Sequence, residues 1–158
     1  MRRRLIASEK IDLIVYDFDG VMTDNTVVVH EDGREAVRVN RADGLGVNLI
    51  RKKKIPQLIL STEKNPVVRA RARKVGLPLI QGVEDKRRVL AAYCERHGYS
   101  PRRTIYVGND TNDVGAMRYV GIAVAPADAH PSILRLAEMV LKTPGGRGVV
   151  RELADRLR

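Results

Sequence analysis

The sequence of 158 residues contains few residues of several kinds, and each shortage excludes a class of protein. Its single cysteine can form no internal disulfide and cannot supply a zinc module built from four cysteines. With no tryptophan and one phenylalanine, it has few aromatic side chains on which single-stranded bases could stack. No apolar run approaches the roughly 20 residues that span a bilayer. We therefore expect a cytoplasmic protein whose partners are neither membranes nor nucleic acids.

Positive charge is in excess, because 29 basic residues face 19 acidic ones and give a formal net charge of +10. A field of this sign attracts anions, such as a phosphorylated metabolite, a nucleic acid or an acidic surface. The basic residues are dispersed along the chain and not gathered in one arm. The charge therefore indicates an anionic partner but does not identify it.

Short apolar runs alternate with longer amphipathic segments along the chain. The runs have the length of strands, and their continuous apolar character is typical of parallel strands covered on both faces. They are residues 11–16, 58–60, 77–80, 104–107, 122–125 and 139–141. The segments that predict helices are residues 43–53, 66–75, 85–97, 113–120, 131–137 and 148–157. This alternation predicts a single α/β domain over residues 1–158, with a Rossmann-like, open and mostly parallel sheet and helices on both faces.

Residues 26–39 depart from the alternation. Their apolar stretches flank Asp32 and Gly33, a pair that predicts a β-hairpin with a two-residue turn. The hairpin follows the first strand closely, and we expect it to project from the domain. The pattern fits two roles equally well: an edge hairpin of the same sheet, or a functional flap or contact surface.

Two carboxylates, Asp17 and Asp19, directly follow the first predicted strand. They belong at the carboxyl edge of the sheet, where open α/β sheets bind ligands. Carboxylates so close together repel each other unless a cation or a proton lies between them. Mg²⁺ prefers such oxygen ligands and also accepts substrate phosphate. An Asp-x-Asp alone is common in solvated loops, but the Gly20 and Thr23-Asp24 that follow make a magnesium site the better interpretation.

Other strand ends carry further candidates. The hydroxyls of Ser61 and Thr62 can hold phosphate oxygens, although such residues also end strands as turn formers. Lys86 opens a helix and can supply a counter-charge for phosphate; the alternative is an ordinary surface lysine. Asp110 and Asp113 follow a later strand, where Asp113 is equally well explained as a helix cap.

Taken in order, these residues resemble the four motifs of the haloacid dehalogenase (HAD) phosphatase superfamily. The resemblance covers nearly the whole chain, and residues 40–46, 125–131 and 145–152 are similar to its small capless branch. That branch includes the phosphatases of 3-deoxy-octulosonate 8-phosphate (KDO-8-phosphate) and of nononate (KDN) 9-phosphate. It also includes the C-terminal domains of some acylneuraminate cytidylyltransferases.

The resemblance implies roles for these residues in an Mg²⁺-dependent phosphatase that acts on a small sugar phosphate. Asp17 is the implied nucleophile, which forms an aspartyl-phosphate, and Asp19 is the implied acid and base. The implied metal ligands are Asp17, the backbone carbonyl of Asp19 and the Asp110 side chain, with Asp113 behind them. The residues implied to bind phosphate are Ser61, Thr62 and Lys86.

The chain departs from the family pattern at two positions. Asn109 stands where many members have an acid, which makes Asp110 the expected metal ligand. Glu63 stands where KDO-8-phosphate phosphatases usually have arginine, and with Arg71 and Lys74 it resembles the nononate 9-phosphate branch. Arg71 and Lys74 share a helix face, which suits a substrate carboxylate but equally a solvated basic surface. The favoured substrate is therefore a nine-carbon, sialic-acid-like 2-keto-3-deoxy acid 9-phosphate, with KDO-8-phosphate as the alternative.

The spacing of the motifs leaves no room for a cap domain, since about 36 residues separate Asp24 from Ser61 and about 23 separate Lys86 from Asp110. A capless core needs cover from elsewhere to control water. The family resemblance implies a homotetramer in which hairpins pair around a central axis and a neighbouring subunit covers each active site. Two alternatives from other classes stay open: a receiver-like phospho-acceptor domain and a non-catalytic HAD module.

Overall fold

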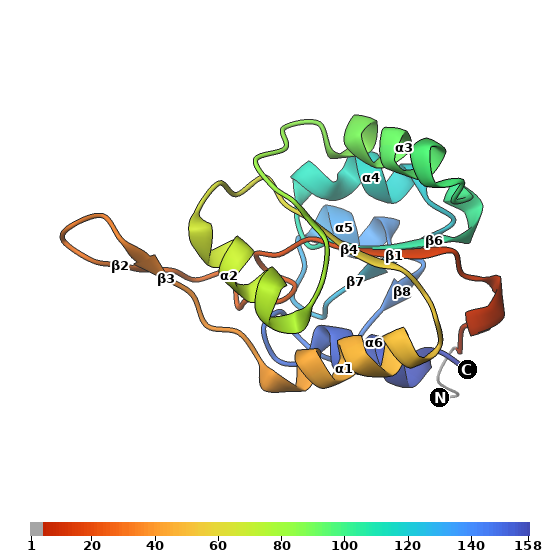
Figure 1. Cartoon of the computed structure of the whole chain (residues 1–158), viewed down its shortest axis with the longest axis horizontal. Helices are drawn as coiled ribbons and strands as arrows, with labels where there is room; N and C mark the ends of the chain where they lie inside the picture. The colour runs from red at the N-terminus through yellow and green to blue at the C-terminus, as the bar shows by residue number, and fades with distance from the viewer. Residues whose placement is uncertain (1–4) are drawn as a thin grey trace.

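The computed structural model describes residues 5–158, and its centre is a six-stranded sheet (Figure 1). From one edge to the other the strands are β5 (Leu79–Ile80), β4 (Gln57–Leu60), β1 (Leu13–Tyr16), β6 (Thr104–Val107), β7 (Ile122–Ala125) and β8 (Met139–Val140). Every neighbouring pair is parallel. All residues of β1, β4 and β6 are buried, which explains why these strands are mostly apolar. The predicted open parallel sheet is confirmed.

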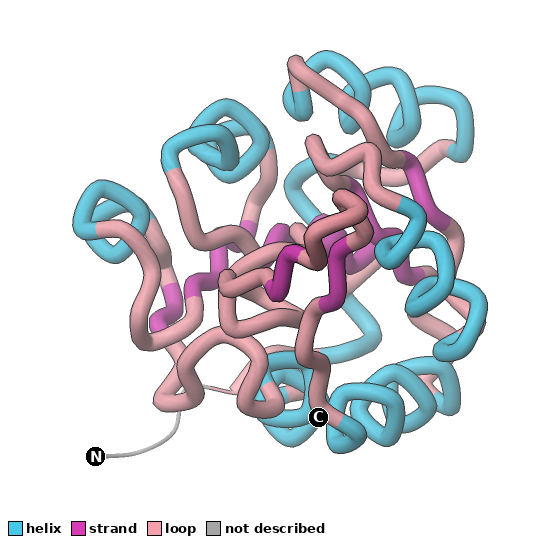
Figure 2. Tube along the Cα trace, turned by 90° about the vertical axis from the view of Figure 1, so that its left-hand side faces the viewer, coloured by secondary structure: helices cyan, strands magenta, loops and turns pink. Residues whose placement is uncertain are grey.

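Helices cover both faces of this sheet, as the view in Figure 2 shows. One hydrophobic cluster joins the sheet to α1 (Arg41–Lys52), α2 (Pro66–Val75) and α6 (Val149–Arg156). A second cluster joins the other face to α3 (Lys86–His97), α4 (Val114–Tyr119) and α5 (Pro131–Leu136). Short 3₁₀ turns are η1 (Ser8–Lys10), η2 (Pro101–Arg103) and η3 (Thr111–Asp113).

The ends of the helices follow local sequence signals. The side chain of Asn65 accepts a hydrogen bond from the main-chain N–H of Val67, and Gly76 ends α2 in the left-handed conformation, with φ +68°. Helix α1 begins at Arg41, two residues before the predicted start, because the side chain of Asn40 caps it. The structure therefore corrects the start of α1 and agrees with the predicted limits of α2.

The hairpin forms a two-stranded antiparallel sheet of its own, from β2 (Val28–Val29) and β3 (Glu35–Ala36). It projects from the domain, at the left of Figure 1, so it is not an edge of the central sheet. The predicted two-residue turn is wrong. His30 donates its main-chain N–H to the carbonyl of Arg34 at 2.8 Å, which leaves three residues in the loop. Gly33, with φ +83°, supplies the left-handed conformation that such a loop needs.

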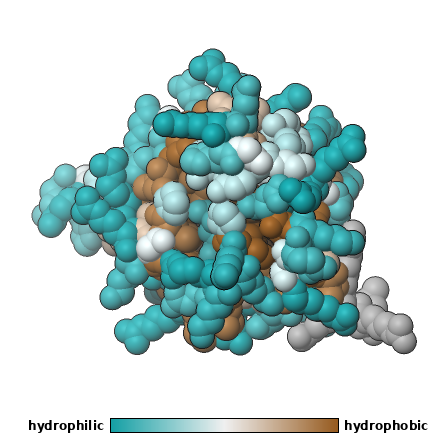
Figure 3. Space-filling model, turned by 45° about the vertical axis from the view of Figure 1, so that its right-hand side comes forward, coloured by the Kyte–Doolittle hydropathy of each residue, from teal (hydrophilic) through white to brown (hydrophobic). Residues whose placement is uncertain are grey.

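The surface combines charged residues with few exposed hydrophobic side chains. Figure 3 shows a face on which hydrophilic side chains surround smaller hydrophobic areas. Three of the most exposed large hydrophobic residues are consecutive on the hairpin: Val27, Val28 and Val29 are 48%, 61% and 63% exposed. Among residues 5–158, no helix is long and apolar enough to cross a membrane.

Candidate active site

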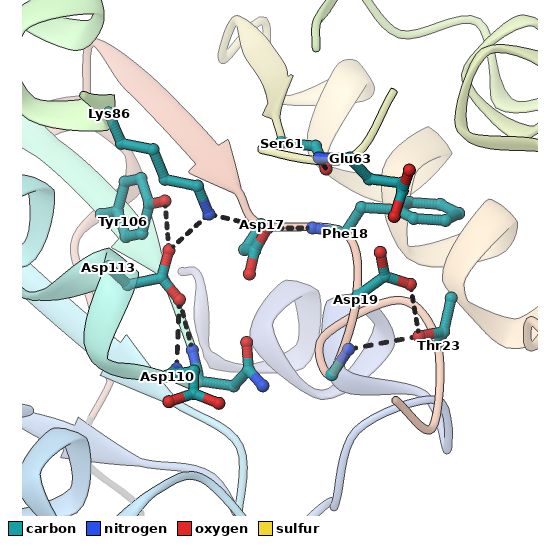
Figure 4. Close-up of polar contacts among 12 residues, drawn as sticks. Asp17, Phe18, Asp19, Thr23, Ser61, Glu63, Lys86, Tyr106, Asp110 and Asp113 are labelled. Carbon is teal, nitrogen blue, oxygen red and sulfur yellow. Dashed lines mark hydrogen bonds and ion pairs between the residues drawn. The ribbon is translucent and has the colours of Figure 1, made fainter. Parts of the chain in front are cut away.

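The carboxyl ends of three neighbouring strands bring the motifs together, because β1 lies between β4 and β6 (Figure 4). Asp17 follows β1, Ser61 follows β4 and Asn109 lies two residues beyond β6. These strand ends border a cavity of about 330 Å³. Its lining residues are Asp17, Asp19, Asn25, Ser61, Thr62, Asn109, Asp110, Thr111 and Asn112.

Asp17 is the most buried carboxylate of this cavity, with 5% of its surface exposed. Its Oδ1 accepts a hydrogen bond from the main-chain N–H of Phe18 at 2.7 Å and lies 2.9 Å from Nζ of Lys86. Burial, together with the nearby charge of Asp113, raises the pKa of Asp17 to about 7, although Lys86 and the Phe18 N–H act in the opposite direction. A cation beside Asp17 would favour its charged form.

Lys86 bridges Asp17 and Asp113 and is only 2% exposed. Asp113 is fully buried, and its Oδ1 lies 2.7 Å from Lys86 Nζ and accepts a hydrogen bond from Tyr106 OH at 2.7 Å. Burial disfavours the charge on Lys86, but the two carboxylates raise its pKa above the ordinary value. The lysine is therefore a charged counter-ion fixed against Asp17.

Asp113 also shapes the loop after β6. Its Oδ2 accepts hydrogen bonds from the main-chain N–H groups of Asn109, at 2.9 Å, and Asp110, at 3.2 Å. One buried carboxylate thus orients both Lys86 and the loop that carries Asn109. The sequence suggested a helix cap at this position, and the capping contact with Asp110 is present together with these further contacts.

Asp19 points into the same cavity and is held by Thr23, which is fully buried (Figure 4). The Thr23 hydroxyl donates to Asp19 Oδ1 at 3.2 Å and accepts from the main-chain N–H groups of Gly20, at 3.2 Å, and Asn25, at 3.1 Å. Burial raises the pKa of Asp19, and the Thr23 hydrogen bond partly opposes this effect. The sequence marked Thr23 only as part of the motif and gave it no role.

The side-chain amide of Asn109 reaches two oxygens of the Asp17–Asp19 segment. The terminal amide atom of Asn109 that faces this segment, either Oδ1 or Nδ2, lies 3.1 Å from Asp17 Oδ2 and 2.9 Å from the backbone carbonyl oxygen of Asp19. With nitrogen at this point, Asn109 donates a hydrogen bond to each oxygen; with oxygen there, three oxygens converge. Gly20 allows this approach, because a Cβ at that position would overlap the Asn109 side chain.

With the Asn109 amide oxygen facing Asp17 and Asp19, the three oxygens would fit a small divalent cation. At an Mg–O distance of about 2.1 Å, adjacent oxygens of an octahedron lie about 3.0 Å apart. The separations of 3.1 and 2.9 Å at Asn109 match this geometry. The Asp110 carboxylate borders the cavity but accepts a hydrogen bond from the main-chain N–H of Thr111 at 2.6 Å. Among residues 5–158, no cluster of three Asp, Glu, His or Cys side chains is placed to hold a metal ion.

The loop before α6 supports the Asp17–Asp24 turn from behind. The main-chain N–H of Gly146 donates to the carbonyl of Val21 at 3.0 Å, and a Cβ on Gly145 would overlap the carbonyl of Gly20. Residues near the C-terminal end of the chain therefore help to fix the loop that carries Asp17.

The expected substrate residues lie in two different places. Glu63 borders a second cavity of about 230 Å³, which shares Asp19 and Asn25 with the first. Arg71 and Lys74 border a separate basic cavity of about 640 Å³ between α1 and α2. The structure brings Glu63 beside Asp19 but does not bring Arg71 and Lys74 to this part of the molecule.

The parallel sheet, the acidic pair after β1 and the lysine that bridges two carboxylates are those of a HAD-type phosphatase. The chain belongs to the haloacid dehalogenase-like hydrolase family, whose pattern matches residues 51–153. It is an enzyme of the phosphatase class with Mg²⁺ as its cofactor, so the family, the activity class and the cofactor predicted from the sequence are confirmed.

The chain is similar to several proteins of known sequence or structure. KDO-8-phosphate phosphatase KdsC of Escherichia coli is 34% identical over 151 residues, which are 95% of this chain and 80% of that protein. The structure of a HAD family hydrolase from Streptomyces avermitilis has a TM-score of 0.94 and 47% identity, covering 97% of this chain and 94% of the other. The KDO-8-phosphate phosphatase of Moraxella catarrhalis, solved with magnesium, phosphate and KDO, has a TM-score of 0.89 and 26% identity, covering 94% and 86%.

Proposed function

We propose that the protein hydrolyses the phosphate monoester of a 2-keto-3-deoxy sugar acid, with KDO-8-phosphate as the first substrate to test. The convergence of Asp17, Asp19 and Asn109 beside Lys86 is the observation that carries this proposal. The E. coli relative, which covers 95% of the chain, bears the eight-carbon substrate in its name. This support favours the alternative over the nine-carbon substrate that the sequence suggested first.

In the proposed reaction, an Asp17 carboxylate oxygen attacks phosphorus while the bond to the sugar oxygen breaks. Asp19 donates a proton to that leaving oxygen and becomes a carboxylate. It then accepts a proton from a water molecule, which attacks the phosphorus of the aspartyl-phosphate. The P–O bond to Asp17 breaks, inorganic phosphate leaves, and both aspartates return to their starting states.

Cationic and polar groups offset the negative charge of the reacting phosphate. Mg²⁺ supplies positive charge that reduces the repulsion between Asp17 and the phosphate. Lys86 neutralises the buried Asp17 carboxylate and lies against it at 2.9 Å. Ser61 and Thr62 border the cavity on the β4 side and are the proposed hydrogen-bond donors to phosphate oxygens.

We propose Asp17, the Asp19 carbonyl and the Asn109 amide oxygen as the protein ligands of Mg²⁺, and Asp110 as the competing third ligand. We expect Asn109→Ala to raise the Mg²⁺ concentration for half-maximal activity by about 10- to 100-fold, and Asp110→Asn by much less. Thermal shifts on adding Mg²⁺ would report the same order without turnover. The opposite order of the two variants would identify Asp110 as the ligand.

The eight- and nine-carbon substrates can be separated by kinetics. We expect steady multiple turnover and a higher kcat/KM for KDO-8-phosphate than for KDN-9-phosphate, with no turnover in Asp17→Asn. The nine-carbon compound stays the second candidate because Glu63 borders the cavity next to Asp19. A higher kcat/KM for KDN-9-phosphate would favour it. Retention of one phosphate per chain without turnover would instead indicate a receiver-like domain, and no reaction at all would indicate a non-catalytic module.

We also propose that residues 1–158 form one domain that works in the cytoplasm as a homotetramer. Two features support assembly: the exposed hairpin valines Val27–Val29, and the distance of Arg71 and Lys74 from the catalytic cavity of their own subunit. A neighbouring subunit could bring these two cations to the substrate carboxylate. Four copies of the 17.6 kDa chain give about 70 kDa, which light scattering would detect. A fully active monomer would contradict the proposal.

A further inference from the structure

The second cavity, of about 230 Å³, lies directly beside the catalytic one and lacks an assigned occupant. It is enclosed by the base of the hairpin, by the loop after β1 and by the loop after β4. It shares Asp19 and Asn25 with the catalytic cavity. A group attached to a phosphate bound at Asp17 can therefore extend past Asp19 into this space.

Its lining is acidic. Asp19, Glu35 and Glu63 contribute three carboxyl groups, and none of its lining residues is basic. An ionised carboxylate accepts hydrogen bonds and donates none, so this lining favours hydroxyl groups and repels anions. Val37 and Val67 add apolar contacts for the carbon atoms of a ligand.

Glu35, on β3 of the hairpin, is held in place at this cavity. Its Oε2 accepts a hydrogen bond from Nδ2 of Asn65 at 3.0 Å, and the Oδ1 of Asn65 caps α2 through the N–H of Val67 at 3.1 Å. Glu63, on the opposite side, is fixed by the main-chain N–H groups of Lys64, at 2.7 Å, and Asn65, at 2.8 Å. Each of these glutamates uses one carboxylate oxygen in these contacts and keeps the other for a ligand.

We infer that this cavity binds the hydroxyl-bearing carbons next to the phosphate of the substrate, and that Glu35 is a specificity-determining residue that accepts hydrogen bonds from these hydroxyls. The inference rests on the proposed function, because it places the leaving group of that reaction. It also implies that the substrate carboxylate lies outside this acidic cavity.

The test compares kcat/KM for three phosphate esters: p-nitrophenyl phosphate, which has no hydroxyl groups, glucitol 6-phosphate, which has hydroxyls and no carboxylate, and KDO-8-phosphate. We expect Glu35→Ala to lower kcat/KM for each hydroxyl-bearing ester, relative to p-nitrophenyl phosphate, by about 10- to 100-fold, mainly through KM. Glu35→Gln, which still accepts a hydrogen bond from Asn65, should show a smaller loss. Glu31→Gln is the matched control, because Glu31 lies at the exposed tip of the same hairpin.

The outcomes separate this inference from the proposed function. An equal loss of kcat/KM on all three esters leaves the ratios between the esters unchanged. This result would assign Glu35 a structural role and overturn the inference. A wild-type enzyme that does not prefer KDO-8-phosphate over glucitol 6-phosphate would overturn the proposed substrate. The effect of Glu35 on the ratio for glucitol 6-phosphate would still decide the role of Glu35.

Discussion

The buried carboxyl group of Asp43 connects two helices. The pH dependence of the free energy of unfolding tests its role. Asp43 lies in α1 and is 1% exposed. Its Oδ1 accepts hydrogen bonds from the main-chain N–H groups of Val150, at 3.0 Å, and Arg151, at 3.2 Å, in the first turn of α6. Its Oδ2 is buried and has no hydrogen-bond partner among the described residues.

Burial is the main cause that raises the pKa of Asp43 from 3.8 to about 6, against the two main-chain hydrogen bonds and the charge of Arg71. A change of this size corresponds to roughly 3 kcal/mol of folding free energy. The folded state binds the Asp43 proton more tightly than the unfolded state. The stability from this group is therefore fully present below about pH 4, is lost as the pH rises through about 6, and is constant above that.

The contribution of Asp43 to the free energy of unfolding can be measured by urea unfolding of the wild type and of Asp43→Asn between pH 4 and pH 8, with a chelator present. We expect the free energy of unfolding of the variant, relative to the wild type, to rise by up to about 3 kcal/mol from pH 4 to pH 7. Any effect of the introduced asparagine on packing is the same at every pH, so it does not contribute to the change of this difference with pH. Asp155→Asn, on the exposed side of α6, serves as the control and should show no such change. A difference between wild type and Asp43→Asn that does not vary with pH would refute the reasoning.

Four further outcomes are expected. Asp19→Asn should lower the rate of phosphate release by roughly 10² to 10⁴, and a smaller loss would remove Asp19 from acid–base catalysis. Lys86→Met should lower the free energy of unfolding at pH 8 by about 3–5 kcal/mol, since Asp17 and Asp113 stay buried without their cation; a loss below about 1 kcal/mol would contradict the buried triad. Thr23→Val should lower kcat/KM for KDO-8-phosphate about threefold to tenfold more than for p-nitrophenyl phosphate, and Thr23→Ser should restore most of it; equal losses would indicate misfolding. Chelation of Mg²⁺ should stop turnover, and added Mg²⁺ should restart it; activity that survives chelation would exclude the proposed cofactor role.

Sequence patterns predicted the parts of the fold that depend on short-range signals and on the meeting of strand ends. Asn65, Pro66 and Gly76 determine both ends of α2 locally. Asp17 and Ser61 meet because their strands are neighbours in a parallel sheet, whatever the detailed shape of the loops. These features follow from periodicity, capping and topology, which a single sequence contains.

Other features of the site depend on side-chain positions that the sequence pattern does not predict. The direction of the Asn109 side chain results from the two hydrogen bonds that Asp113 forms with its loop and from the absence of a side chain at Gly20. The sequence favoured Asp110 as the metal ligand because many family members have an acid where this chain has Asn109, and this assignment stays a prediction. The helical spacing of Arg71 and Lys74 predicted a shared face, but it could not show that α1 and α2 enclose that face away from the catalytic cavity.

The contact between the Gly145–Gly146 loop and the Asp17–Asp24 turn has a consequence during biosynthesis. A ribosome produces the turn before its support, and a chain that ends before Gly145 lacks the backbone that fixes the turn after Asp17. Nascent chains shorter than about residue 148 should therefore lack an ordered catalytic turn. Competence for phosphoryl transfer would then appear only after the Gly145–Gly146 loop has been translated.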